Sequence, residues 1–235
     1  MKALAAGNPK ILDFVRLQAE VGNLEVERQG YLNNRYRTIA AIKAAFSRAK
    51  SDDNLAEEYA HDAAIAGDTS NLHAKILGKE IASPKELTEA LEAIAKDNPT
   101  GLSNTKVGTV NGLPIAVEIA NEGEGHLRMV AHIGVKARQR VDLENSFFTD
   151  EKAAPGVRIL NFIRSLSKTA ERYRKEADAE RASAENLGSV LKNMPEVYAR
   201  EEELNQKRAQ LIALQTELSV QEKIGRASCR ERVSE

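Results

Sequence analysis

Hydrophobic side chains recur at alternating steps of three and four residues near both ends of the chain. Such spacing puts them on one stripe of a helix, as in a coiled coil. A helix with a single apolar stripe needs a partner, so the two runs most simply pair with each other as antiparallel helices. The first run contains Phe14, Leu17, Val21, Leu24, Tyr31 and Ile42; the second contains Ile159, Phe162, Leu166, Ala170, Tyr173, Ala177, Ala184, Leu187, Leu191 and Met194.

Prolines and acidic residues mark where these helices begin, bend or end. Asn8-Pro9 is the expected start of the first helix, because proline is tolerated in the first helical turn. Pro195 is expected to kink or restart the second helix, after which Leu204, Leu211, Leu214 and Leu218 continue an apolar face. The acidic stretch 52–66 either ends the first helix or forms a separate short one.

The pattern changes between the two runs, after the helix-breaking cluster Gly67-Asp68-Thr69-Ser70. Ser83-Pro84-Lys85-Glu86 has the form of a capping box and predicts a helix to about Lys96. Asn111-Gly112 between two apolar runs predicts a hairpin turn, and a second turn is expected at 122–125. The predicted strands are His73–Ile76, Lys79–Ala82, Thr105–Val110, Pro114–Ala120, His126–Ile133 and Val135–Leu143.

These elements predict an α+β protein: a long antiparallel coiled-coil helical hairpin with a small antiparallel-sheet α+β domain inserted at its tip. The first coiled-coil arm would cover residues 1–67 and the inserted domain residues 68–149. The returning arm would cover 150–223, followed by a tail at 224–235.

Composition narrows the function classes. The chain has 235 residues, a net charge of −1, 29% charged and 4% aromatic residues, which is typical of long solvated helices and argues against a globally polybasic protein. No apolar run is long enough to span a membrane, and the first ten residues lack the core of a signal peptide. With Cys229 as its one cysteine, the chain forms no internal disulfide, and we expect a cytoplasmic protein.

Motifs for catalysis or cofactor binding are missing from the sequence. There is no phosphate-binding loop, no complete dinucleotide fingerprint and no nucleophile elbow. His61, His73, His126 and His132 are scattered along the chain, so no metal site is predicted. We therefore expect no cofactor and no enzymatic activity of this chain by itself.

One group of cations remains as candidate chemistry. On the predicted strand Val135–Leu143, period-two alternation places Lys136, Arg138 and Arg140 on one face, about 6.7 Å apart, which roughly matches phosphates along an extended nucleic-acid strand. Arg128 and His132 share the parity and would extend the patch. The candidate DNA contacts are thus Lys136, Arg138, Arg140 and Arg128. The same alternation is also that of the solvent face of any antiparallel sheet.

The first arm is basic as well. Residues 1–50 carry nine Lys or Arg and four Asp or Glu. A basic helix can follow a phosphate backbone with a strongly salt-dependent affinity. It can equally pair with acidic residues of the returning arm.

The opening residues Lys2 to Pro9, followed by Ile11 and Leu17-x-x-Glu20-Val21-x-x-Leu24, resemble one family of proteins. It comprises the large Swi/Snf-like helicase and adenine-specific DNA methylase proteins of phages, plasmids and conjugative elements. In their carboxy-terminal region a similar segment closes the helicase part and precedes a coiled-coil arm, a small β-rich domain and a returning arm. The order here is similar over residues 2–222, and Tyr31-Leu32 with Tyr36, Val107-Gly108-x-x-Asn111-Gly112 and Leu211-x-x-Leu214 also match.

The resemblance implies a non-catalytic accessory segment that positions DNA or a partner relative to the motor. Its partners would be the upstream helicase and methylase domains of the parent chain, and DNA. The parent would be an ATP-dependent helicase or DNA adenine methyltransferase, Met1 would be an internal methionine, and residues 224–235 resemble a translated sequencing-adapter artefact. The alternative is a stand-alone coiled-coil structural protein that dimerises and binds protein through the tip domain.

Overall fold

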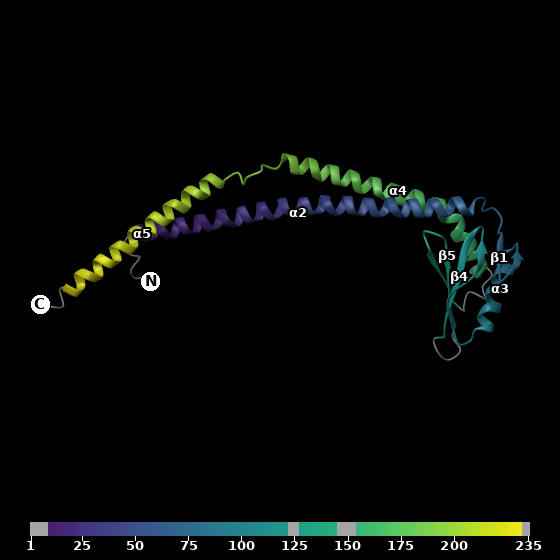
Figure 1. The fold of residues 1–235 in the computed structure, drawn as a ribbon. Helices are drawn as coiled ribbons and strands as arrows, with labels where there is room; N and C mark the ends of the chain where they lie inside the picture. The colour runs from purple at the N-terminus through teal and green to yellow at the C-terminus, as the bar shows by residue number, and fades with distance from the viewer. Residues whose placement is uncertain (1–8, 122–126, 145–153, 232–235) are drawn as a thin grey trace. The chain divides into compact units, whose positions relative to one another are not determined.

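The protein is α+β, with long helices and one six-stranded antiparallel sheet (Figure 1). The computed structural model describes residues 9–121, 127–144 and 154–231, and the side chains of 9–121, 128–143 and 154–220. The helices are α2 (Pro9–Ala66), α3 (Pro84–Asp97), α4 (Pro155–Asn193) and α5 (Glu201–Glu231). The strands are β1 (Ala74–Ile76), β2 (Lys79–Ile81), β3 (Leu102–Val110), β4 (Leu113–Asn121), β5 (Leu127–Ile133) and β6 (Gln139–Glu144).

The chain divides into two compact units. Unit 1 combines residues up to Ala44 with those from Ser183 onward, and unit 2 comprises Ala45–Ala182. Unit 1 therefore holds α5 with the first part of α2 and the last part of α4. Unit 2 holds the sheet and α3 with the end of α2 and the start of α4.

Helix α2 begins at Pro9, as predicted, and runs without interruption to Ala66. It ends where Gly67 adopts a φ of +59° and donates its N–H to the carbonyl of Ala63 at 3.1 Å. The alternative of a separate short helix over 52–66 is wrong. Ala56 and Tyr59 are buried there and continue the apolar stripe of α2 through the acidic stretch.

In unit 1, α2 packs against α5. Val21 and Leu24 of α2 enclose Leu204 of α5, and all three are buried, with Leu211 packed beside them. The two helices run antiparallel, because Lys10 pairs with Glu217 whereas Arg28 pairs with Glu201. The predicted interruption at Pro195 is confirmed, since α4 ends at Asn193 and α5 begins at Glu201.

In unit 2, every neighbouring pair of strands is antiparallel, in the order β2-β1-β3-β4-β5-β6. The predicted turn between β3 and β4 is confirmed: Asn111 and Gly112 both have positive φ, at +47° and +77°, as a two-residue hairpin turn requires. The Asn111 side chain fixes this turn by accepting from the His73 N–H at 3.2 Å and donating to the Asn71 carbonyl at 3.1 Å.

The cap of α3 is the one its sequence predicts. Ser83 Oγ accepts the N–H of Glu86 at 3.2 Å, and the Glu86 carboxylate reaches back to the N–H of Ala82 at 3.0 Å. The apolar side of α3 then covers one face of the sheet, together with the start of α4 and the end of α2. The core of unit 2 therefore lies on that face, where alternate strand residues such as Ile115 and Met129 are fully buried.

Two predicted strands begin more than two residues away from their start in the structure. The strand predicted over Val135–Leu143 is wrong in its first half: β6 begins at Gln139, and residues 134–138 form a loop. Gly134 and Arg138 turn this loop with positive φ values of +118° and +33°. Strand β3 begins at Leu102 rather than at Thr105. The turn predicted at 122–125 and residue His126 lie outside the described residues.

Candidate nucleic-acid interface

The structure separates the four predicted DNA contacts into two pairs. Arg128 lies on β5 and Arg140 on β6, and both face away from the core because their neighbours Met129 and Val141 are buried on the other side. Lys136 and Arg138 lie in the loop that precedes β6. The regular spacing predicted for Lys136, Arg138 and Arg140 is therefore wrong, because only Arg140 lies on a strand.

Arg128 and Arg140 share an acidic neighbour. Asp142 Oδ1 lies 3.6 Å from a guanidinium nitrogen of Arg128 and 3.0 Å from one of Arg140. All three side chains are about half exposed, and ion pairs of this kind contribute little to stability. Asp142 thus partly neutralises the two guanidiniums and holds them on the same side of the sheet.

The loop at 134–138 is fixed from below by Asp62. This fully buried carboxylate accepts the backbone N–H groups of Val135, Lys136 and Ala137, each at 3.1 Å. Successive N–H groups that converge on one anion form a nest. Because these amides bond Asp62, they form no hydrogen bonds to a neighbouring strand. The side chains of Lys136 and Arg138 remain exposed above it.

An open pocket of about 280 Å³ lies on the same face of the sheet as Arg128 and Arg140. Its centre is a row of cross-strand neighbours, in which Lys106 pairs with Ala116 and Ala116 with His132. The loop closes one side of the pocket with Val135 and Arg138. The remaining lining residues are Asn104, Pro114, Ile115 and Gly134.

Lys106 and Asn104 are not among the residues that the sequence predicts for this site. Counting back from the Asn111-Gly112 turn places Lys106 opposite Val117, on the core face. A register shift between Lys106 and Gly108 instead pairs Lys106 with Ala116 and turns it to the open face. The expected extension of the patch to His132 is found on this face, where its Nε2 lies 3.2 Å from the Glu118 carboxylate.

The basic first arm pairs with the returning helices. Besides Lys10 and Arg28 in unit 1, Arg48 in unit 2 forms a two-point bond with Glu180 at 2.8 Å. That bond raises the pKa of Arg48 and lowers the pKa of Glu180. Part of the positive charge of this arm therefore pairs with acidic residues of the returning helices, which is the alternative to a contact with DNA.

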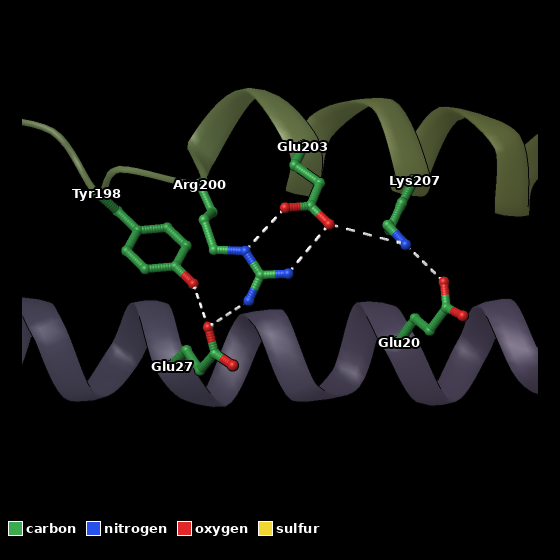
Figure 2. Close-up of polar contacts among 6 residues, drawn as sticks. All are labelled: Glu20, Glu27, Tyr198, Arg200, Glu203 and Lys207. Atoms are coloured by element: carbon green, nitrogen blue, oxygen red, sulfur yellow. Dashed lines mark hydrogen bonds and ion pairs between the residues drawn. The ribbon is translucent and has the colours of Figure 1, made fainter.

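In other polar pairs of unit 1 the acidic residue lies on α2, and its partner lies on α5 or just before it (Figure 2). Glu27 of α2 accepts from the Tyr198 hydroxyl at 2.7 Å and from Arg200 at 2.9 Å. Arg200 also bonds Glu203 at 2.8 Å, and Lys207 reaches Glu20 at 2.5 Å. The contacts of Tyr198 and Arg200 are exposed and that of Lys207 with Glu20 is partly buried, and together they hold the beginning of α5 against α2.

The bonds of this cluster shift the titration of its members. The hydrogen bond from Tyr198 is the main reason why the pKa of Glu27 is lowered, and Lys207 lowers the pKa of Glu20 in the same way. Arg200 lowers the pKa of Glu203, and its own pKa is raised by that bond. All three carboxylates are therefore held in the charged form to a lower pH than usual.

Two other kinds of site are absent from the described part of the chain. None of its helices combines the length and hydropathy that a membrane span needs. Its His, Cys, Asp and Glu side chains form no cluster of three or more placed to hold a metal ion. The charged open face of the sheet is thus the strongest candidate site among these residues.

Comparison with models of protein families, with curated proteins and with solved structures finds no match for this chain. The resemblance to the helicase and methylase proteins therefore rests on the opening segment and on the order of the predicted parts.

Proposed function

We propose that this chain is a non-catalytic accessory segment of a mobile-element DNA helicase or DNA methyltransferase, and that its sheet contacts DNA. One observation carries the DNA contact: cations from three strands and one loop gather on the face of the sheet that α3 and α4 leave uncovered. They are Lys106, Arg128, Arg138 and Arg140, beside His132, against the carboxylates Glu118 and Asp142.

The proposed contact is with the phosphate backbone. Lysine and arginine on a flat sheet face neutralise phosphates without reading base edges, so the binding would position DNA with little sequence preference. This role suits an accessory segment, because sequence choice and catalysis would belong to the parent's other domains.

We further propose that the helices act as coiled-coil arms that carry the sheet as an inserted domain. Support comes from each unit taken by itself. In unit 1 α2 pairs antiparallel with α5, and in unit 2 Tyr59 of α2 packs on Tyr173 of α4 with ring centroids 5.6 Å apart. The arms would connect the charged face to the parent's motor.

The test compares two double variants with the same change in charge. Arg128→Gln with Arg140→Gln removes two cations of the open face. Lys85→Gln with Lys96→Gln removes two exposed cations of α3, on the covered side of the sheet. DNA affinity is measured by fluorescence anisotropy between about 50 and 200 mM salt.

The open-face variant is expected to bind DNA more weakly. The slope of its salt dependence should fall by about one for each phosphate that the protein no longer neutralises. The α3 variant should bind as the parent chain does. Equal affinities and equal salt slopes for the two variants would exclude Arg128 and Arg140 as DNA contacts.

A dimeric structural protein is a second candidate, and exposed apolar residues favour it. Leu12, Val15 and Val26 are each more than half exposed, and helical spacing puts them on one side of α2. A second copy of the chain packed there would give twice the mass of the 25.8 kDa monomer by light scattering. Val26→Lys should then restore the monomer.

A further inference from the structure

We propose that the pocket at Ala116 binds a phosphate group, supplied either by a nucleotide or by a DNA strand. The pocket is a more specific feature than the charged face as a whole, and it shares Arg138 with the predicted DNA contacts. With a DNA strand as the source, the inference rests on the proposed function. With a nucleotide as the source, the inference does not depend on the proposed function.

The sheet register builds the hollow. Ala116 of β4 lies directly between Lys106 of β3 and His132 of β5, so a methyl group separates two longer side chains. Neighbouring strands lie about 4.8 Å apart, which places the Lys106 and His132 backbones roughly 9.6 Å from each other. A tetrahedral phosphate fits above a small residue flanked in this way.

The polar groups around the hollow suit an anion. Lys106 and Arg138 bring two positive charges, and Asn104 brings further hydrogen-bond donors. Pro114 and Ile115 are apolar residues of the lining. The Glu118 carboxylate lies 3.2 Å from His132 Nε2, and Glu118 is not among the lining residues of the pocket.

The loop that carries Arg138 is held in one conformation. Arg138 has a φ of +33°, which is unfavourable for a residue with a side chain. Gly134 at the other end allows no side chain, since a Cβ would lie 2.5 Å from Asp62 Oδ2. Strain that is maintained by a buried clamp, at a residue lining a pocket, is typical of a binding site.

The test uses the full chain and three phosphate probes at constant ionic strength: inorganic phosphate, deoxyadenosine monophosphate and a single-stranded oligonucleotide. The readout is the NMR shift of the backbone amides of Ala116, His132 and Arg138. Ala116→Leu fills the hollow without a change in charge, and Ala116→Ser is the control that leaves it open. Arg138→Gly removes a cation and suits the local backbone, so it provides the test should Ala116→Leu fail to fold.

Inorganic phosphate should give saturable shifts at these amides. Ala116→Leu and Arg138→Gly should weaken the binding by about tenfold or more, and Ala116→Ser should keep it. Absence of saturable shifts, or an unchanged affinity in both Ala116→Leu and Arg138→Gly, overturns the inference. Competition then identifies the source, because the probe that displaces inorganic phosphate at the lowest concentration carries the preferred phosphate.

The variant Arg128→Gln with Arg140→Gln separates the two proposals. It should keep the affinity for inorganic phosphate, because neither residue lines the pocket. Unchanged DNA binding in this variant together with weaker phosphate binding in Ala116→Leu would contradict the DNA contact at Arg128 and Arg140 and leave the pocket as the phosphate site. Weaker DNA binding in this variant together with unchanged phosphate binding in Ala116→Leu would contradict only the proposal for the pocket.

Discussion

The carboxylate of Asp62 accepts the backbone N–H of Ala137 at 3.1 Å, although 75 positions separate the two residues in the chain. The neighbouring amides of Val135 and Lys136 bond the same carboxylate. The end of α2 therefore determines the conformation of the loop before β6. Without this acceptor, three amides of the loop would lose their partner: those of Val135 and Lys136, which are partly buried, and that of Ala137, which is buried.

Asp62→Asn should destabilise unit 2 by about 2–3 kcal/mol, because an amide offers one acceptor oxygen and turns its own N–H groups toward the loop's donors. Urea denaturation followed by circular dichroism measures the change. Glu57→Gln is the matched control, since Glu57 is an exposed carboxylate on the same helix. Equal midpoints for the two variants would show that the nest does not stabilise the fold.

Arg138→Gly should leave stability unchanged or raise it by up to about 1 kcal/mol, because glycine adopts a φ of +33° without steric cost. Arg140→Gly, in the regular strand β6, should instead lower stability by about 0.5–1 kcal/mol. Thermal unfolding of both variants gives the comparison. A marked decrease in stability for Arg138→Gly would mean that the guanidinium contributes to the fold itself.

Much of the fold follows from local signals in the sequence. The stripe from Phe14 onward predicts α2, the Ser83 capping box predicts the start of α3, and Asn111-Gly112 predicts the β3–β4 turn; each of these elements is present. These features depend on residues a few positions apart, so spacing and turn chemistry are enough to find them.

The candidate site depends on contacts that local patterns do not contain. The alternation from Val135 to Val141 favours a strand, but the distant Asp62 takes the amides that a ladder would use. A single register shift beside Lys106 likewise moves that cation from the core face to the open face. The cations of β5 and β6 were thus predictable, whereas the pocket was not.

Leu204→Ala should weaken the packing of α5 on α2 by about 2–4 kcal/mol, because Leu204 is fully buried against Val21 and Leu24. Ile212→Ala, on the exposed side of α5, should change stability by less than about 0.5 kcal/mol. Urea denaturation monitored by helical circular dichroism distinguishes the two. Equal effects would contradict the packing of α5 through its Leu204 side.

The cluster of Glu20, Glu27 and Glu203 predicts an acid-sensitive pairing of α2 with α5. Hydrogen bonds and cations lower the pKa of all three carboxylates in the folded protein. The unfolded chain therefore binds protons first as the pH falls, and the contribution of the cluster decreases from about pH 4.3 downward. Above that range the contribution is complete, and added salt should reduce it because the groups are exposed.

Denaturation midpoints at pH 7, 5, 4 and 3 test this dependence. The triple variant Glu20→Gln, Glu27→Gln, Glu203→Gln should be less stable at neutral pH and show a flatter pH profile than the parent chain. Replacing three other exposed carboxylates of unit 1 provides the control: Asp13→Asn, Glu185→Gln and Glu196→Gln should keep the parent's profile. If both triple variants flatten the profile equally, general charge rather than the bonds of Figure 2 accounts for the acid sensitivity.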